Sequence, residues 1–359
     1  MARRGPGLSG TRPSDLARGV TAEFLTIRPS PVRWPLAAGG ALSMGIPLAG
    51  FTLLGREDLG LMTSIGGFLA LYLGGRSRRD RARALPLLGI GLVAASGLGA
   101  AAAPARASSA GALFVVTTVA ALAVYGFSVG PPGAMFFVLA CGVGVHLAAP
   151  VALGGVGRAA WLVPVMTGLG CVIAYAIVLA PLLLPRVWHQ DRAAHEERRP
   201  WSFGYHPADG VVVVRVVAGT ALGLLVAMPL SLSHIYWVLL TVVAILQGGV
   251  GRRITAVRGL QRVVGTIVGL AVFSVILRVD PHGLWLAVVV AALQFGTELV
   301  ITRNYGLALV LVTPLALTIS SQGTASREGL ALERLGDTLL GAACAAAVLA
   351  GGWLARRRR

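Results

Sequence analysis

Long apolar runs recur along the whole chain and are separated by short segments rich in arginine. A transmembrane helix needs about 20 predominantly apolar residues, and the runs have about this length. Only 13% of the residues are charged, about half of the fraction that is usual in a soluble domain. The sequence therefore predicts an all-α polytopic membrane protein. We expect about twelve transmembrane helices, at residues 36–54, 58–75, 85–103, 109–129, 132–153, 159–184, 211–230, 235–250, 262–277, 282–300, 304–321 and 331–354.

The composition excludes several functional classes. All 31 basic residues are arginine, so the chain lacks the lysine of a phosphate-binding P-loop or a Schiff base. A net charge of +17 would indicate nucleic acid only on a solvated basic face, which the apolar runs do not offer. No nucleophile–base pair of hydrolase type can be assembled. We expect no enzymatic activity, no ATP and no nucleic acid.

The three cysteines are Cys141, Cys171 and Cys344, and all lie within apolar runs. They lack the paired spacing of a metal site or a disulfide framework, so they are interpreted as small packing residues. We expect neither a metal nor a cofactor.

The arginines are distributed unevenly between the two sides of the predicted membrane protein. With a cytoplasmic N-terminus, all but six of them fall on the inner side. Such a bias is typical of cytoplasmic loops and supports an even number of spans. We therefore expect a multi-pass protein of the inner (plasma) membrane with both termini in the cytoplasm. The six arginines on the outer side are Arg56, Arg106, Arg158, Arg278, Arg327 and Arg334.

A long polar segment divides the chain into two halves of six spans each. The expected parts are a cytoplasmic N-terminal tail (1–35), a first six-helix half (36–184), a cytoplasmic linker (185–210), a second six-helix half (211–355) and a basic C-terminal tail (356–359).

The two halves share short motifs in the same order. "GGRSRR" from Gly74 matches "GGVGRR" from Gly248, and Arg33 and Arg215 each precede a proline by the same interval. An even number of spans per half keeps both copies in one orientation, so the motifs predict two parallel repeats. In transporters built this way the substrate site tends to lie between the repeats. A homo-oligomer is compatible with this arrangement.

The stretch "GGVGRRITAVRGLQRVVGTIVGL" (248–270) carries four arginines, which at least hold a loop in the cytoplasm. Arg262 stands at the start of an apolar helix, where topology alone does not explain it. Arg262 or Arg303 is expected to bind a carboxylate at the inner mouth through charge-assisted hydrogen bonds.

Glu298 is an ionisable residue near the cytoplasmic end of the tenth span, where burial in hydrocarbon requires a partner or a water path. One interpretation is a structural ion pair with Arg303 or Arg262. The other is a protonatable carboxylate that couples proton entry to substrate exit. Gln247 is a polar residue in an apolar run and is a candidate for lining the path.

Arg334 and Asp337 are three residues apart and share a helix face near the outer end of the last span. They are interpreted either as a capping ion pair or as a contact for an anion that leaves the cell. His234, Tyr236 and Trp237 begin the eighth span and are interpreted as part of the interfacial aromatic belt.

Four stretches of the second half resemble the fusaric acid resistance protein-like (FUSC) family of bacterial membrane proteins. They are "YWVLLTVVAIL" from Tyr236, "RGLQRVVGTIVGL" from Arg258, "RNYGLALVLVTPLAL" from Arg303 and "RLGDTLLGAACAA" from Arg334. The residues that carry over from the family pattern are Arg258, Arg262, Gly265, Thr266, Arg303, Asn304, Tyr305, Arg334, Asp337 and Thr338.

The resemblance implies a secondary transporter of the inner membrane that exports aromatic carboxylic acids. Some family members work with a periplasmic membrane-fusion partner, but the short linker of this chain argues against one. The plant malate channels are similar in their membrane region. We therefore expect an exporter of small organic anions, with proton coupling through Glu298; a passive anion channel and a membrane scaffold of an envelope assembly are the alternatives.

Overall fold

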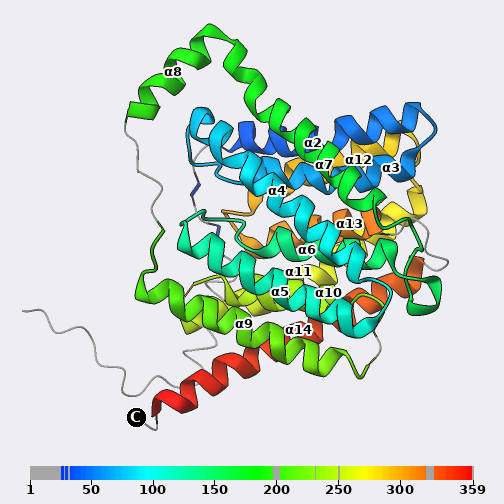
Figure 1. Ribbon diagram of the computed structural model, residues 1–359, viewed down its shortest axis with the longest axis vertical. Helices are drawn as coiled ribbons and strands as arrows, with labels where there is room; N and C mark the ends of the chain where they lie inside the picture. Colours follow the sequence, from blue (N-terminus) through cyan, green and yellow to red (C-terminus); the bar gives the residue numbers. More distant parts are fainter. Residues whose placement is uncertain are drawn as a thin grey trace, which may run out of the picture.

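The computed structural model describes residues 26–27, 29–30, 33–196, 203–230, 232–249, 251–320 and 327–357. Most of the expected N-terminal tail and the last two arginines lie outside these residues. The regular elements of the described part are all helices, and the long ones run roughly side by side (Figure 1).

The first half contains α2 (Trp34–Leu53), α3 (Glu57–Ser64), the 3₁₀ segment η1 (Gly66–Leu71), α4 (Arg78–Ala102), α5 (Arg106–Gly126), α6 (Met135–Ala148), η2 (Val151–Leu153), α7 (Leu162–Leu179) and η3 (Ala180–Leu183). The linker contains α8 (Pro185–Glu196). The second half contains α9 (Pro207–Ala227), α10 (Ile235–Leu246), α11 (Arg252–Val279), α12 (Leu284–Val300), α13 (Tyr305–Ser320) and α14 (Arg327–Arg357).

Seven of the described helices are long and apolar enough to cross a membrane, and four shorter apolar helices, α6, α10, α12 and α13, accompany them. The protein is therefore a multi-pass membrane protein, but twelve full-length spans are not confirmed. The expected second span is broken into α3 and η1, and the expected eighth span is only the 12 residues of α10.

The broken segment α3–η1 and the short helix α10 are both buried largely inside the protein. In α10 every residue from Tyr236 to Leu246 is buried, so this helix belongs to the core and needs no bilayer length. The α3–η1 segment packs against α2 and α7, and a Cβ atom on Gly66 would lie against the backbone of Thr167. Irregular backbone is tolerated at membrane depth where protein covers it, as here.

The two halves repeat the same pattern of helix contacts. The pairs α4–α6, α4–α7 and α2–α7 of the first half recur as α11–α13, α11–α14 and α9–α14 in the second. Across the halves, α2 packs on α12 as α9 packs on α5. The matching motifs also take the same place relative to the helices. Helix α4 begins at Arg78 and α11 at Arg252, and each of these arginines is the fifth residue of its motif.

The linker helix α8 packs against the start of α4. The Asp191 carboxylate accepts hydrogen bonds from the backbone N–H groups of Arg78 (2.7 Å) and Arg79 (3.0 Å). The guanidinium group of Arg79 lies 4.1 Å from the centre of the Trp188 ring. The linker therefore contributes to the structure of the first half.

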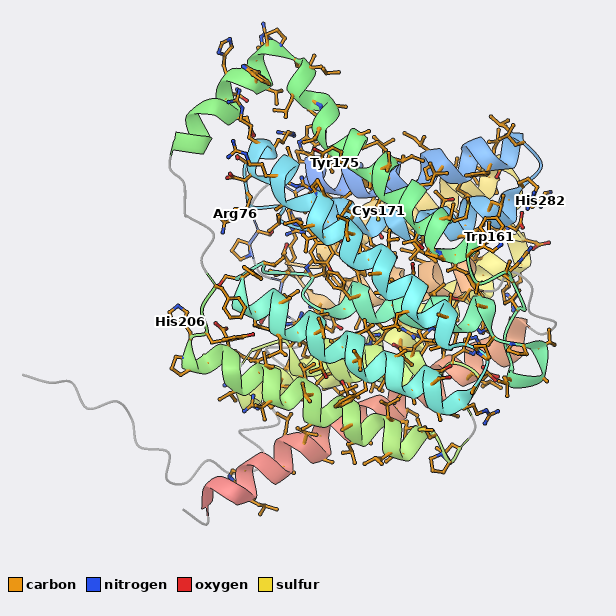
Figure 2. All side chains as sticks on the ribbon, in the orientation of Figure 1. Arg76, Trp161, Cys171, Tyr175, His206 and His282 are labelled. Atoms are coloured by element: carbon orange, nitrogen blue, oxygen red, sulfur yellow. The ribbon has the colours of Figure 1, made fainter. Side chains whose placement is uncertain are left out.

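The bundle has two distinct ends. Arg76 and His206 lie toward one edge of the molecule, and Trp161 and His282 toward the opposite edge (Figure 2). The edge at which α4 and α11 begin is called the arginine end. The opposite end, where α10 and α14 begin, is called the histidine end.

Candidate functional site

A central cavity of about 100 Å³ lies between the two halves. Residues of η1 and α6 from the first half line it together with residues of α10 to α14 from the second. Most of the wall is apolar or aromatic, and the rings of Phe68 and Phe136 stack at 4.2 Å. The ionisable groups of this wall are Arg262, Glu298, Tyr305 and Arg334.

Arg334 reaches this cavity from α14 and is only 2% exposed. Its guanidinium group lies 5.0 Å from the centre of the Trp237 ring. Among the described residues, its Nε and Nη1 atoms have no hydrogen-bond partner. A buried guanidinium with unused donors is costly, because each N–H group has lost its water without a replacement.

Arg262 reaches the cavity from α11 and is 3% exposed. Its Nη1 atom donates a hydrogen bond to the Tyr305 hydroxyl (3.2 Å), while Nε has no partner in the described part of the chain. Gln294 on α12 also lines the cavity, and its Nε2 atom is likewise without a described acceptor. Two buried cations and one amide therefore surround a cavity with unused N–H donors, which is an environment suited to an anion.

Glu298 lies on the cavity wall, but its partner is neither Arg303 nor Arg262. The ion pair joins Arg33 Nη2 to Glu298 Oε2 at 2.8 Å, and Arg33 Nε donates to the Glu298 backbone carbonyl at 3.2 Å. The expected partners were wrong because Arg33, directly before α2, is brought beside the end of α12 only by the packing of these two helices. The pair connects the first half to the second.

A second cavity of about 190 Å³ lies toward the arginine end, next to Arg258, Arg303 and Asn304. Arg303 is exposed, and Asn304 caps α13, since its Oδ1 atom accepts a hydrogen bond from the N–H group of Leu307 at 3.1 Å. Tyr305 lines both cavities. Its ring is held between Arg258, 4.6 Å from the ring centre, and the hydrogen bond from Arg262. Tyr305 therefore separates the two cavities.

Asp337 and Gln247 do not line the central cavity. Asp337 borders a hollow at the histidine end together with Glu333, and no ion pair joins it to Arg334 among the residues that the structure describes. Gln247 lies at the end of α10, where its Nε2 atom donates to the Pro132 carbonyl at 3.0 Å and its own carbonyl accepts from the Tyr125 hydroxyl at 3.1 Å. Gln247 thus joins the two halves outside the cavity.

The prediction that His234, Tyr236 and Trp237 belong to an interfacial aromatic belt is also wrong. His234, Tyr236 and Trp237 are 4%, 2% and 1% exposed, because the start of α10 is covered by protein and not by lipid headgroups. Trp237 faces the central cavity. The sequence analysis missed Gln294 and His146, although each is a polar residue in an otherwise apolar run, which is the signal that drew attention to Glu298.

Comparison with known proteins agrees with the membrane architecture. Residues 219–348 match the family model described as fusaric acid resistance protein-like. The chain is 34% identical over 121 residues to the uncharacterized membrane protein YvaC of Bacillus subtilis (strain 168). The aligned region covers 34% of this chain and 19% of YvaC. The chain is also 34% identical over 113 residues to the uncharacterized protein YhfK of Escherichia coli (strain K12), covering 31% of this chain and 16% of YhfK. The matched part thus spans less than a fifth of either relative, and no solved structure matches.

Proposed function

We propose that the protein exports small organic anions, with aromatic carboxylates as the first class to test, across the inner membrane through the central cavity. The observation that carries the proposal is the set of unused N–H donors on Arg262, Arg334 and Gln294 around one cavity between the halves. The match of residues 219–348 to the fusaric acid resistance protein-like model supports it.

The cavity suits a carboxylate attached to a small ring. The carboxylate would accept charge-assisted hydrogen bonds from Arg262 and Arg334, which are the strongest hydrogen bonds open to a buried guanidinium. The ring would lie against the apolar and aromatic wall, where Phe68 and Trp237 stand. Because the cavity measures only about 100 Å³, against roughly 300 Å³ or more in most ligand pockets, this conformation would hold one small acid at most.

The path would begin at the arginine end. Arg303 and Arg258 would attract the anion into the second cavity, next to the arginine end. Displacement of Tyr305 would then admit the anion to the central cavity. The recurrent helix contacts support two parallel repeats, which would expose the site alternately by rocking against each other. The concentration of arginines at one end supports a cytoplasmic location for that end and for both termini.

Glu298 is the proposed proton-coupling residue. Its carboxylate holds Arg33 across the boundary between the halves. Protonation would remove one charge of this pair and weaken the contact that keeps the halves together at the arginine end. Proton binding would thereby favour movement of one repeat against the other.

The test is uptake of labelled 4-hydroxybenzoate into proteoliposomes with an acidic lumen, corrected for leak with protein-free liposomes. We expect uptake above equilibrium that collapses with the pH gradient. Arg334→Gln and Arg262→Gln should each lower uptake at least tenfold, while Arg278→Gln, an exposed arginine on the same helix as Arg262, should not. Wild-type uptake in the two cavity variants would overturn the proposal.

The same assay separates the carrier from its alternatives. Glu298→Gln should abolish uptake driven by the pH gradient while the protein still inserts into the membrane. Downhill flux that follows voltage and ignores pH would identify an anion channel. Absence of flux for a panel of aromatic acids would favour a membrane scaffold.

A further inference from the structure

Two buried histidines touch each other at the histidine end. His146 lies in the last turn of α6 in the first half, and His234 directly precedes α10 of the second; their ring centres are 4.4 Å apart. They are 6% and 4% exposed. Both ring nitrogens of His146 and Nε2 of His234 have no hydrogen-bond partner among the described residues. A buried pair in which three of the four ring nitrogens lack such a partner is costly and requires an explanation.

The histidine pair is connected to the central cavity by a continuous set of contacts. His234 Nδ1 lies 2.8 Å from Glu333 Oε2, and the Glu333 side chain is 47% exposed. The His234 ring stacks on Trp237 at 4.2 Å and 12°. The guanidinium group of Arg334, which lines the cavity, also lies over the Trp237 ring, 5.0 Å from its centre. A proton that enters beside Glu333 would therefore lie one indole ring away from the proposed anion site.

The charges around the pair come from few elements. Helix α5 contributes Arg106, which borders a cavity of about 60 Å³ together with His146. Helix α14 contributes Glu333, Arg334 and Asp337, and α10 contributes the Tyr236 hydroxyl. At this end α4, α7 and α9 carry no charged side chain.

These charges determine how a proton on the pair would respond to an anion. Two imidazolium groups with ring centres 4.4 Å apart would repel each other, so a proton on one ring disfavours a proton on the other. Glu333 stabilises that proton, whereas Arg106 and Arg334 oppose it. An anion bound at Arg334 neutralises one of these opposing charges. The proton and the anion must then favour each other, because linkage between two sites is reciprocal.

We propose that His146 and His234 form a proton-binding site that is linked to the anion site through Trp237 and Arg334. Anion binding draws one proton onto the pair from the aqueous phase at the histidine end, and a lower pH at that end strengthens anion binding. The site is separate from the Arg33–Glu298 pair, which lies near the arginine end. This inference rests on the proposed function, since it requires the central cavity to bind an anion.

The experiment is calorimetric titration of 4-hydroxybenzoate into the protein in lipid nanodiscs, at pH 8 and pH 6, in two buffers of different ionisation enthalpy. We expect affinity to rise about fivefold to tenfold at pH 6, with net proton uptake in the wild type. His146→Gln and His234→Gln should each abolish the pH dependence and the proton uptake. His282→Gln, an exposed histidine at the same end, should retain both.

A neutral analogue and a carboxylate variant sharpen the test. Uptake of protons should vanish with 4-hydroxybenzamide, because the amide brings no charge to Arg334. Glu333→Gln should move the pH dependence to lower pH, because the proton loses its nearest counter-charge. Binding that is equally tight at pH 8 and pH 6, or a pH dependence that survives in both histidine variants, would overturn the linkage and leave the proposed function standing. Failure of 4-hydroxybenzoate to bind at either pH would overturn both.

Discussion

Helices α4 and α11 follow similar motifs and make similar contacts with later helices, α4 with α6 and α7 and α11 with α13 and α14, but they differ in the side chains they carry. Helix α4 begins at Arg78 and α11 at Arg252, which are the fifth residues of the two matching motifs. Counted from that residue, Ala84 and Leu88 of α4 stand where α11 has Arg258 and Arg262. The equivalent helices therefore present apolar residues in the first half and cations in the second.

The spaces beside these helices differ in the same way. Along α4, a largely apolar crevice of about 940 Å³ is lined by residues of α4 and α5, with Ala84 and Leu88 among them and with Asp80 and Arg83 as its charged residues. Along α11, Arg262 faces the small central cavity and Arg258 faces the cavity next to it. Corresponding positions of the two helices thus line a largely apolar crevice in α4 and cavities with buried or partly buried arginines in α11.

The largest expected effect comes from exchanging the residues of the two helices. Arg262→Leu gives α11 the residue of α4 and should abolish anion uptake. It should leave the unfolding temperature unchanged or raise it, because replacing a buried charge by an apolar side chain is often neutral or stabilising. Uptake assays and thermal unfolding of the purified protein test both points. Loss of uptake together with a clear loss of stability would instead indicate a structural arginine.

The reverse exchange should harm the first half. Leu88→Arg places a cation in a largely apolar crevice, where no described carboxylate other than Asp80 is available to pair with it. We expect a lower unfolding temperature and lower yield of membrane-inserted protein, measured by thermal unfolding and by quantifying the membrane fraction. Leu88→Met serves as the matched control and should behave as the wild type.

A smaller effect is expected at the next equivalent pair, Gly91 and Gly265. A Cβ atom on Gly265 would lie 2.6 Å from the Gly306 backbone carbonyl oxygen, whereas on Gly91 it would meet a ring atom of Phe137 at 2.8 Å. Backbone cannot move aside as a side chain can, so Gly265→Ala should destabilise the protein by about 1–3 kcal/mol. Gly91→Ala should cost less, partly because alanine favours a helix by about 1 kcal/mol over glycine. Equal unfolding free energies for the two variants would contradict this packing argument.

The smallest effect concerns how the two helices begin. The Ser77 hydroxyl accepts a hydrogen bond from the Asp80 N–H group at 3.2 Å, while Gly251 gives α11 no side-chain cap. Ser77→Ala should cost about 1 kcal/mol. Gly251→Ser should stabilise α11 slightly, since its backbone is already extended at this position. Hydrogen exchange of the first turn of each helix measures both changes; unchanged exchange would show that α8 alone holds the start of α4.

Several features of the protein follow from the sequence. Apolar runs of bilayer length predicted the membrane class, and seven described helices are long and apolar enough to cross a membrane. The prediction of two repeats rests on the matching motifs, which directly precede or begin α4 and α11. The cost of burying a charge also drew attention to Glu298, which lies in the protein interior. These properties depend on residues close together in the chain, or on the free energy required to move a charge out of water.

Only the tertiary structure decided which side chains meet. It paired Glu298 with Arg33, brought Arg262 and Arg334 to one cavity, and placed His146 beside His234. It also covered α10 with protein, so that a run expected to cross the bilayer became a core helix. Contacts between helices depend on their relative rotation and depth, and small residues that permit close approach, such as Gly66 and Gly265, set these in three dimensions. The sequence by itself determined that this is a helical membrane protein with buried cations, and the packing of its two halves gave those cations a common cavity.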